Sequence, residues 1–160
     1  QYFRSAGNHT SASSSPEITN YLITSSLISS LDFRDKVTGD QWANLFLKFR
    51  LYTEPTNGSI RVLIYSPKKT GVRFTPSSFL FVTIPDPSSF WVLYDQVLTD
   101  DDVNGHNNLQ RNVSLKKLKT IYDSNAAAIQ KGEVIMSVIS EGTSGTIQFS
   151  YGYELGFHNK

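Results

Sequence analysis

Short runs of alternating apolar and polar residues make up most of this chain, and clusters of Ser, Pro, Gly, Asn and Asp separate them. Residues 41–53 carry large apolar side chains at the odd positions from 45 to 51, with Lys48 and Arg50 between them. Residues 147–157 repeat this two-residue period with more aromatic surface. Because side chains alternate between the two faces of a strand, both segments are predicted to be half-buried β-strands.

Four further strands are predicted, at residues 60–66, 90–98, 112–122 and 133–140. The runs at 90–98 and 133–140 are apolar on both faces, which is typical of strands buried between two layers. In the run at 112–122, alternation breaks at Lys116 and Lys117, which predicts a bulge or a twisted edge.

Turn residues lie between these strands. Asn57 and Gly58 tolerate positive φ, so they predict a tight hairpin between residues 41–53 and 60–66. Residues 75–89 hold a short apolar run bounded by prolines, which predicts a long connection with room for one edge strand.

The opening segment supports two interpretations. Residues 15–31 could form a helix with Ser15 as its cap and Pro16 at its first position. Their many Ser, Thr and β-branched residues favour a strand instead. Residues 1–16 are expected to form a flexible N-terminal arm, and residues 17–160 one domain.

Seven or eight antiparallel strands in one domain predict an all-β fold, either a two-sheet sandwich, a jelly roll or a barrel. The aromatic face of residues 147–157 is expected to fill the space between two sheets. This strand should be central in its sheet, since an exposed edge so apolar would aggregate.

Composition narrows the classes of protein. A chain of 160 residues without Cys can form one domain without disulfides or thiolate metal sites. No apolar run is long enough to span a membrane, and no membrane partner is expected. The formal charge of +1 means that any nucleic-acid site must come from local clusters of Lys and Arg. Because the chain begins with Gln1, we expect that a segment precedes it.

The sequence offers no catalytic constellation. His9, His106 and His158 are scattered over loops and ends, where solvated histidines are common. No nucleophile elbow, zinc-binding helix or phosphate loop occurs. We therefore expect that the protein is not an enzyme.

Residues 100–106 contain the first half of a calcium loop, with oxygen ligands at Asp100, Asp102 and Asn104 before a glycine. The twelfth position, which should be Glu, is Arg111, so the segment is not an EF-hand. It is either an acidic turn or a partial site, with Asp101, that a neighbouring subunit completes. We expect that no cofactor is required. If the segment is a partial site, Ca²⁺ could bind there at subunit interfaces.

The one basic cluster predicted in the ordered domain combines Arg111 with Lys116, Lys117 and Lys119. On a strand, Lys117 and Lys119 share a face and could follow a phosphate backbone, with Tyr122 able to stack on a base. A solvated strand that resists aggregation explains the same lysines.

The order of segments resembles a known family. Residues 30–53, "SLDFRDKVTGDQWANLFLKFRLYT", resemble the start of the jelly roll in coat proteins of the satellite tobacco necrosis virus type. Residues 60–71, "IRVLIYSPKKTG", resemble the next strand of capsid proteins from small circular single-stranded DNA viruses. The runs "FWVLYDQVLTDDD", "RNVSLKKLKTIYD", "KGEVIMSVISE" and "IQFSYGYELGFHN" then follow in the order of that family's later strands.

This resemblance implies an eight-stranded antiparallel jelly roll whose copies form an icosahedral shell, of about sixty subunits, around a single-stranded genome. It implies location in the virion, and in the host nucleus or cytoplasm during assembly. Such proteins carry a basic arm before the first strand, and here only Arg4 represents it. Genome contact would therefore come mainly from an upstream arm, with Arg4, Arg111, Lys116, Lys117 and Lys119 on the genome-facing side.

Aromatic residues in or beside the long connection are candidates for contact between subunits: Phe79, Phe81, Phe90 and Trp91. Packing within the chain beneath a long loop is the alternative for each of them. A different function also stays open, that of a calcium-dependent carbohydrate- or ligand-binding β-sandwich. In it residues 100–105 would hold calcium and Trp42 or Trp91 would stack on a sugar.

Overall fold

The computed structural model describes residues 1–10, 17–53, 58–76, 79–99, 107–142 and 148–159. Their helices are α1 (Ile23–Ser29) and α2 (Phe33–Lys36). Their strands are β1 (Tyr2–Thr10), β2 (Glu17–Leu22), β3 (Gln41–Thr53), β4 (Gly58–Pro67), β5 (Phe90–Thr99), β6 (Asn107–Asp123), β7 (Ala128–Lys131), β8 (Ile135–Gly142) and β9 (Gln148–Asn159).

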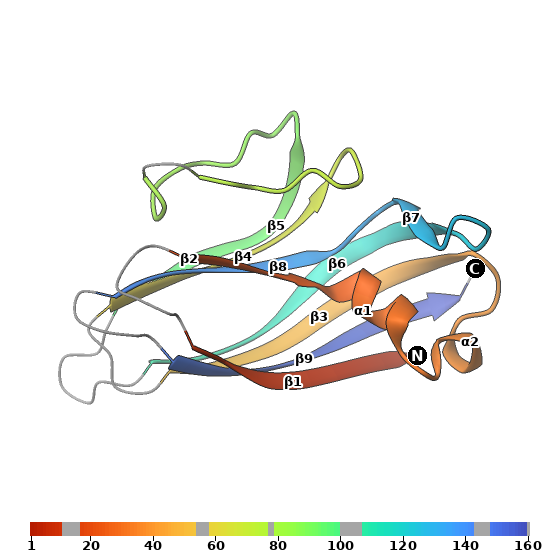
Figure 1. Ribbon diagram of the computed structural model, residues 1–160, viewed down its shortest axis with the longest axis horizontal. Helices are drawn as coiled ribbons and strands as arrows, with labels where there is room; N and C mark the ends of the chain where they lie inside the picture. The colour runs from red at the N-terminus through yellow and green to blue at the C-terminus, as the bar shows by residue number, and fades with distance from the viewer. Residues whose placement is uncertain (11–16, 54–57, 77–78, 100–106, 143–147, 160) are drawn as a thin grey trace.

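The strands form two antiparallel sheets packed face to face (Figure 1). Sheet A has the order β1-β9-β3-β6-β7, and sheet B has the order β2-β8-β4-β5. The first four strands alternate between the sheets, and the last strands return to lie beside the first ones. This is the connectivity of a jelly roll, with the short strand β7 added beyond β6 as a ninth strand. The predicted all-β jelly-roll sandwich is confirmed.

Strand β9 fills the centre of the sandwich, as its aromatic alternation predicts. It is hydrogen-bonded to β1 on one side and to β3 on the other. Phe149, Tyr153, Leu155 and Phe157 are buried in the main core, while Gln148 and Ser150 are exposed on the opposite face. The two-residue period of the sequence therefore fixes which face of the strand is buried.

The expected flexible arm at residues 1–16 is wrong for residues 2–10, which form β1. All nine residues of this strand pair with β9, from Tyr2 opposite Gly156 to Thr10 opposite Gln148. Phe3 is buried against Tyr153, so apolar contact accompanies the backbone pairing. The rest of the predicted arm, residues 11–16, lies outside the described residues.

The opening segment is a strand in its first half, as favoured, and a helix in its second half, but the helix begins at Ile23 after Leu22 and not at Pro16. Residues 17–22 are a strand that pairs with β8, and residues 23–29 are helix α1. The Ile23 amide donates to the Val134 carbonyl and the Val134 amide donates to Thr24 Oγ1. Ile23 and Leu27 are fully buried, so α1 closes one end of the core.

The predicted hairpin between residues 41–53 and 60–66 is wrong. Strand β3 pairs with β6 and β9 in sheet A, whereas β4 pairs with β5 and β8 in sheet B. Since Leu47 and Phe49 of β3 and Val62 and Ile64 of β4 belong to one core, the two strands face each other across it. The Asn-Gly pair indicated a reversal of the chain but not a change of sheet.

The bulge predicted at Lys116 and Lys117 is confirmed. Both residues have positive φ, 54° and 57°, and the register between β3 and β6 shifts between Asn44 and Phe46. The Lys116 amide donates to Ser114 Oγ at 3.2 Å. This backbone conformation lets Leu115 and Leu118 both turn inward, although they are three residues apart.

The prediction of burial on both faces is confirmed for β8 and wrong for much of β5. Every described side chain of β8 is buried. Strand β5 is the edge of sheet B, and Trp91, Val92 and Val97 are partly exposed on it. A run that is apolar on both faces therefore indicates either an inner strand or an edge strand with exposed apolar side chains.

Residues 68–89, which we call the connection, cover the outer face of sheet B (Figure 1). Their described part contains no strand, so the long connection is confirmed and the edge strand within it is wrong there. Beneath the connection lies a second core, made by both the sheet and the connection. Its buried members are Leu63, Tyr65, Phe74, Leu80, Phe90, Ile135 and Ile139.

Two arginines hold the connection to the sandwich, Arg61 through a hydrogen bond to the Leu80 carbonyl and Arg73 through an ion pair. The buried Arg61 guanidinium donates to both carboxylate oxygens of Asp95, at 2.8 and 2.6 Å, and to the Leu80 carbonyl at 2.9 Å. Arg73 forms a second bidentate pair with the buried Glu133, at 3.1 and 3.0 Å. Bidentate geometry of this kind fixes orientation as well as distance.

Arg61→Met should destabilise the fold by about 2–3 kcal/mol, because it leaves the Asp95 carboxylate and the Leu80 carbonyl without their donor. Urea unfolding measures this change, and hydrogen exchange should show faster exchange of amides in the connection. Lys48→Met, which alters an exposed cation of β3, is the matched control. Equal stability of the two variants would contradict this role of Arg61.

Candidate assembly and nucleic-acid surfaces

The outer face of sheet A carries a row of charged side chains that the strand register brings together. Arg4 of β1 lies opposite Glu154 of β9, which lies opposite Lys48 of β3. Two residues further along each strand, the next row of outward-facing residues has Ala6 opposite Gly152 and Gly152 opposite Arg50. Alternation along each strand keeps all of these residues away from the core.

A shallow hollow of about 580 Å³ lies over this part of the sheet. Arg4, Lys48, Arg50 and Glu154 line it, together with small residues. Gly152 has no side chain and its nearest outward neighbour is Ala6, so the floor of the hollow stays low. Arg4 Nε donates to Glu154 Oε2, which leaves two cations in the hollow beyond that pair. A hollow with excess positive charge can receive phosphate groups.

The structure brings only one of the predicted nucleic-acid residues, Arg4, into this hollow. Lys119 faces the same side of sheet A further along, because its neighbours Leu118 and Thr120 pack inward and it pairs with Ala43. Lys116 and Lys117 are exposed at the bulge of β6.

Arg111 lies on the other face of β6, in the inward row of Leu109 and Val113, and its side chain reaches the Tyr94 hydroxyl of β5. Burial raises the pKa of the Tyr94 hydroxyl, and the Arg111 charge opposes that rise. Tyr122 is buried against Phe33, so it cannot stack on a base.

Lys48 and Arg50 were not among the predicted site residues. Their signal was present, since both alternate with buried Leu47, Phe49 and Leu51. The sequence does not predict the strand register, which brings Lys48 and Arg50 close to Arg4 and sets Arg50 opposite Gly152. That pairing joins segments about a hundred residues apart.

Apolar side chains gather on the opposite side of the molecule, at the connection. Phe79 is 71% exposed, Val82 72% and Ile84 85%, and we call these three residues the apolar tip. The connection has a fixed path here, since the Val82 and Thr83 amides both donate to the Phe79 carbonyl. Large apolar groups held in water on an anchored segment are typical of a contact surface.

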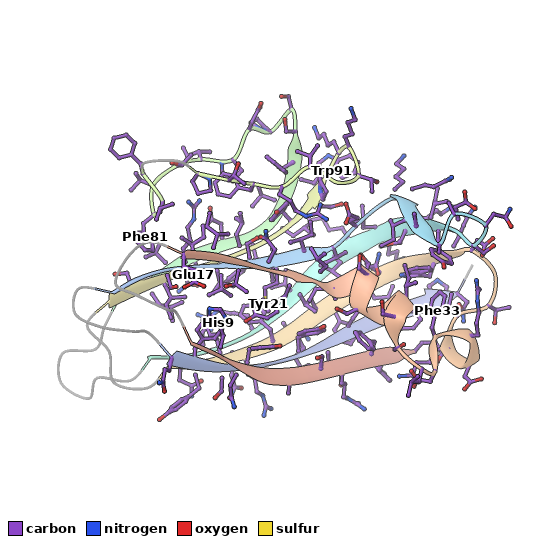
Figure 2. The ribbon with its side chains drawn as sticks, viewed as in Figure 1. His9, Glu17, Tyr21, Phe33, Phe81 and Trp91 are labelled. Carbon is purple, nitrogen blue, oxygen red and sulfur yellow. The ribbon has the colours of Figure 1, made fainter. Side chains whose placement is uncertain are left out.

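The four predicted interface aromatics fall into three groups. Phe79 is exposed in the apolar tip, and Trp91 is 43% exposed at the far end of the connection from Phe81 (Figure 2). Phe81 is half-buried against the second core. Phe90 is buried in that core against Tyr65 and Phe74, so the interface prediction is wrong for it and the alternative of packing within the chain holds.

The two histidines among the described residues lie apart from each other and from any acidic cluster. They contain no cluster of three His, Asp or Glu side chains able to hold a metal ion. His9 joins the two sheets, with Nε2 at 3.2 Å from Thr19 Oγ1 and 3.6 Å from Glu17 Oε1 (Figure 2). His158 is an exposed residue of β9. No helix in this part of the chain is long and apolar enough to cross a membrane.

Only some of the residues predicted for the alternative function lie within the described part of the chain. Trp42 is fully buried and donates to Asn44 Oδ1 at 3.1 Å, so it cannot stack on a sugar. The calcium candidates Asp100, Asp101, Asp102 and Asn104 lie outside the described residues, as does His106.

No protein-family model matches this chain, and a search of curated proteins finds no match. Viral capsid proteins are among its structural neighbours. The BFDV capsid protein, from a crystal structure of a 60-mer, is 9% identical over 98% of this chain and 91% of its own, with a TM-score of 0.47. A chain of Broad Bean Stain Virus is 9% identical over 74% of this chain, with a TM-score of 0.42.

The chain spans 59% of the length of that Broad Bean Stain Virus chain. A cleaved adhesin domain of Lys-gingipain from Porphyromonas gingivalis is also similar, at 14% identity over 74% of this chain and 57% of its own, with a TM-score of 0.33. At such low similarity the function has to be argued from the residues of this chain.

Proposed function

We propose that this chain is a viral capsid protein, a structural subunit without enzymatic activity that assembles with its own copies. The observation that carries this proposal is the apolar tip: Phe79, Val82 and Ile84 are exposed on a connection that Arg61 and Arg73 anchor. Its shell would be icosahedral, of about sixty copies, and it would enclose a single-stranded genome.

Energetics support assembly through this surface. A side chain of this size contributes about 1.5–3 kcal/mol when it is fully removed from water. The main core of the sandwich is already closed by α1 and β9, so the tip is not needed to complete it. Because the connection is anchored before contact, docking would order few additional groups and would lose little conformational entropy.

The two faces of the sandwich differ in a way that suits a shell subunit. The apolar tip belongs to the sheet B side, and the cationic hollow belongs to the outer face of sheet A. We therefore assign the genome-facing side to sheet A, with Arg4, Lys48, Arg50 and Lys119 as its cations. Most contact with the genome would still come from a basic arm upstream of Gln1.

The same proposal places the protein in the virion, and in the host nucleus or cytoplasm during assembly. Arg111, Lys116 and Lys117 lie outside the hollow, so they would contact the genome less than the cations of sheet A. Calcium between subunits, through Asp100, Asp102 and Asn104, is an optional addition to the proposal and no cofactor is required.

Replacement of the apolar tip should impair assembly. In the variant with Phe79→Ser and Ile84→Ser, removal of two apolar side chains that contribute about 1.5–3 kcal/mol each should raise the concentration needed for assembly at least about tenfold. Sedimentation velocity and negative-stain microscopy measure this effect. Leu31→Ser, which removes an equally exposed apolar residue between α1 and α2, should have little effect. A wild-type chain that stays monomeric at high concentration would sink the proposal.

The hollow on sheet A should bind single-stranded nucleic acid. Lys48→Gln and Arg50→Gln together should lower the salt slope of oligo(dT) binding by about 0.7 for each phosphate that the protein no longer neutralises. Fluorescence anisotropy of the dispersed subunit at several salt concentrations measures the slope. Lys69→Gln removes a cation from the connection, on the other side of the sandwich, and should leave the slope nearly unchanged. An equal decrease in both variants would mean that binding is not localised to sheet A.

A further inference from the structure

A pocket of about 350 Å³ opens between the two sheets where β5 faces the bulge of β6. From sheet B it is lined by Ser66, Trp91 and Leu93, and from sheet A by Leu115, Lys116 and Leu118. Its volume is that of a small-molecule site. Most of the lining is apolar, and no carboxylate or carboxamide side chain contributes to it.

Ser66 marks this pocket as more than a packing defect. The residue is fully buried, and its Oγ is the one buried side-chain polar atom in the described part of the chain that has no hydrogen-bond partner. A buried hydroxyl without a partner costs about 1–3 kcal/mol, so such groups are rare in proteins unless a ligand or water satisfies them. Ser66 pairs with Trp91 across β4 and β5, and both line the pocket.

Positive charge lies at the same pocket. Lys116 lines it from the bulge, where a positive φ of 54° sets the course of its backbone. The Lys68 ammonium lies 5.6 Å from the centre of the Trp91 ring. The acid near Lys68 is Asp86, whose pKa is lowered first by hydrogen bonds from Ser88 and only slightly by Lys68. The Lys116 ammonium has no ion pair within the described residues.

We propose that this pocket binds a small carboxylate with an apolar body. The carboxylate would accept a hydrogen bond from the Lys116 ammonium, and the apolar body would lie against Trp91, Leu93, Leu115 and Leu118. The Ser66 hydroxyl has almost no exposed surface in the ligand-free protein, so the carboxylate would reach it only as the wall of the pocket opens. A hydroxyl and an ammonium are both donors here, so the ligand has to supply the acceptor. Apolar walls exclude water from the pair and strengthen it.

A nucleotide fits these walls less well. A base carries several donors and acceptors on its edges, and Ser66 is the only side-chain hydroxyl in the lining. The other polar atoms of the base would stay unpaired against leucine side chains, which costs binding energy. The pocket is therefore distinct in its chemistry from the cationic hollow on sheet A, and this inference does not depend on the proposed function.

The chain contains its own reporter for the test. It has two tryptophans, and only Trp91 lines the pocket, while Trp42 is buried elsewhere and serves as an internal reference. Octanoate is titrated into the dispersed subunit at concentrations below those at which octanoate forms micelles. The NMR signal of the Trp91 indole N–H should shift saturably, and the corresponding signal of Trp42 should not move. Octan-1-ol, which lacks the charge, should bind about tenfold more weakly.

Two variants sharpen the test. Lys116→Asn, which keeps a residue that tolerates positive φ, should weaken octanoate binding about tenfold. Lys117→Asn is the matched control, because Lys117 has a φ of 57° and does not line the pocket. Ser66→Ala should weaken octanoate binding about fivefold and yet leave the free protein as stable or more stable, since it removes an unpaired hydroxyl.

Several outcomes would overturn the proposal. Equal affinity for octanoate and octan-1-ol would mean that the acid is not recognised. If Lys116→Asn and Lys117→Asn weakened octanoate binding equally, Lys116 would not be a specific ligand-binding residue. If Ser66→Ala destabilised the free protein, the Ser66 hydroxyl would contribute to folding and not to ligand binding. A shift of the Trp91 signal by deoxyadenosine monophosphate but not by octanoate would make the pocket a nucleotide site. None of these results depends on whether the chain assembles.

Discussion

The Arg61 guanidinium, buried beneath the connection on the outer face of sheet B, is the contact on which the layered arrangement depends. It joins three parts of the molecule, since it pairs with Asp95 of β5, donates to the Leu80 carbonyl and lies 5.5 Å from the centre of the Phe74 ring. A bidentate pair of this kind fixes the orientation of the guanidinium as well as its distance from the carboxylate, so the remaining donor points at one place in the connection. The connection is therefore held in one place over the second core, and its exposed apolar residues keep a fixed arrangement in water.

This anchoring gives the two outer faces of the sandwich different properties. Sheet B is covered by the connection, so the surface on that side is the connection itself, with Phe79, Val82 and Ile84. No described segment covers sheet A in this way, and its outer face keeps the polar and cationic side chains that alternate with the core residues of β1, β3 and β9. An apolar surface on one side and a cationic one on the other suit the proposed shell subunit, which must contact its copies and its genome at different places.

Residue patterns predicted the strands better than their partners. Alternation located β3 and β9 and their buried faces, and the break at Lys116 and Lys117 located the bulge, because these features depend on neighbours in sequence. The hairpin after β3 was wrong because a tight turn and a crossing between sheets use the same turn residues. The arm at residues 2–10 was wrong because the polar strand β1 gains its stability from β9, at the other end of the chain. For the same reason Lys48 and Arg50 could be placed outward but not beside Arg4.

The pocket follows from two irregularities that face each other. On sheet B, the register between β4 and β5 shifts between Ile64 and Tyr65, just before Ser66. On sheet A, the bulge of β6 lies across from it and breaks the alternation between Leu115 and Leu118.

Regular strands would bring successive apolar residues into the gap at even spacing and close it. Where both sheets lose their period at one level, the side chains no longer interdigitate, and a space remains with a serine hydroxyl in its wall. Bulges disrupt the hydrogen-bond ladder locally and redirect side chains, and here the two irregularities together keep open the space that the proposed carboxylate would fill.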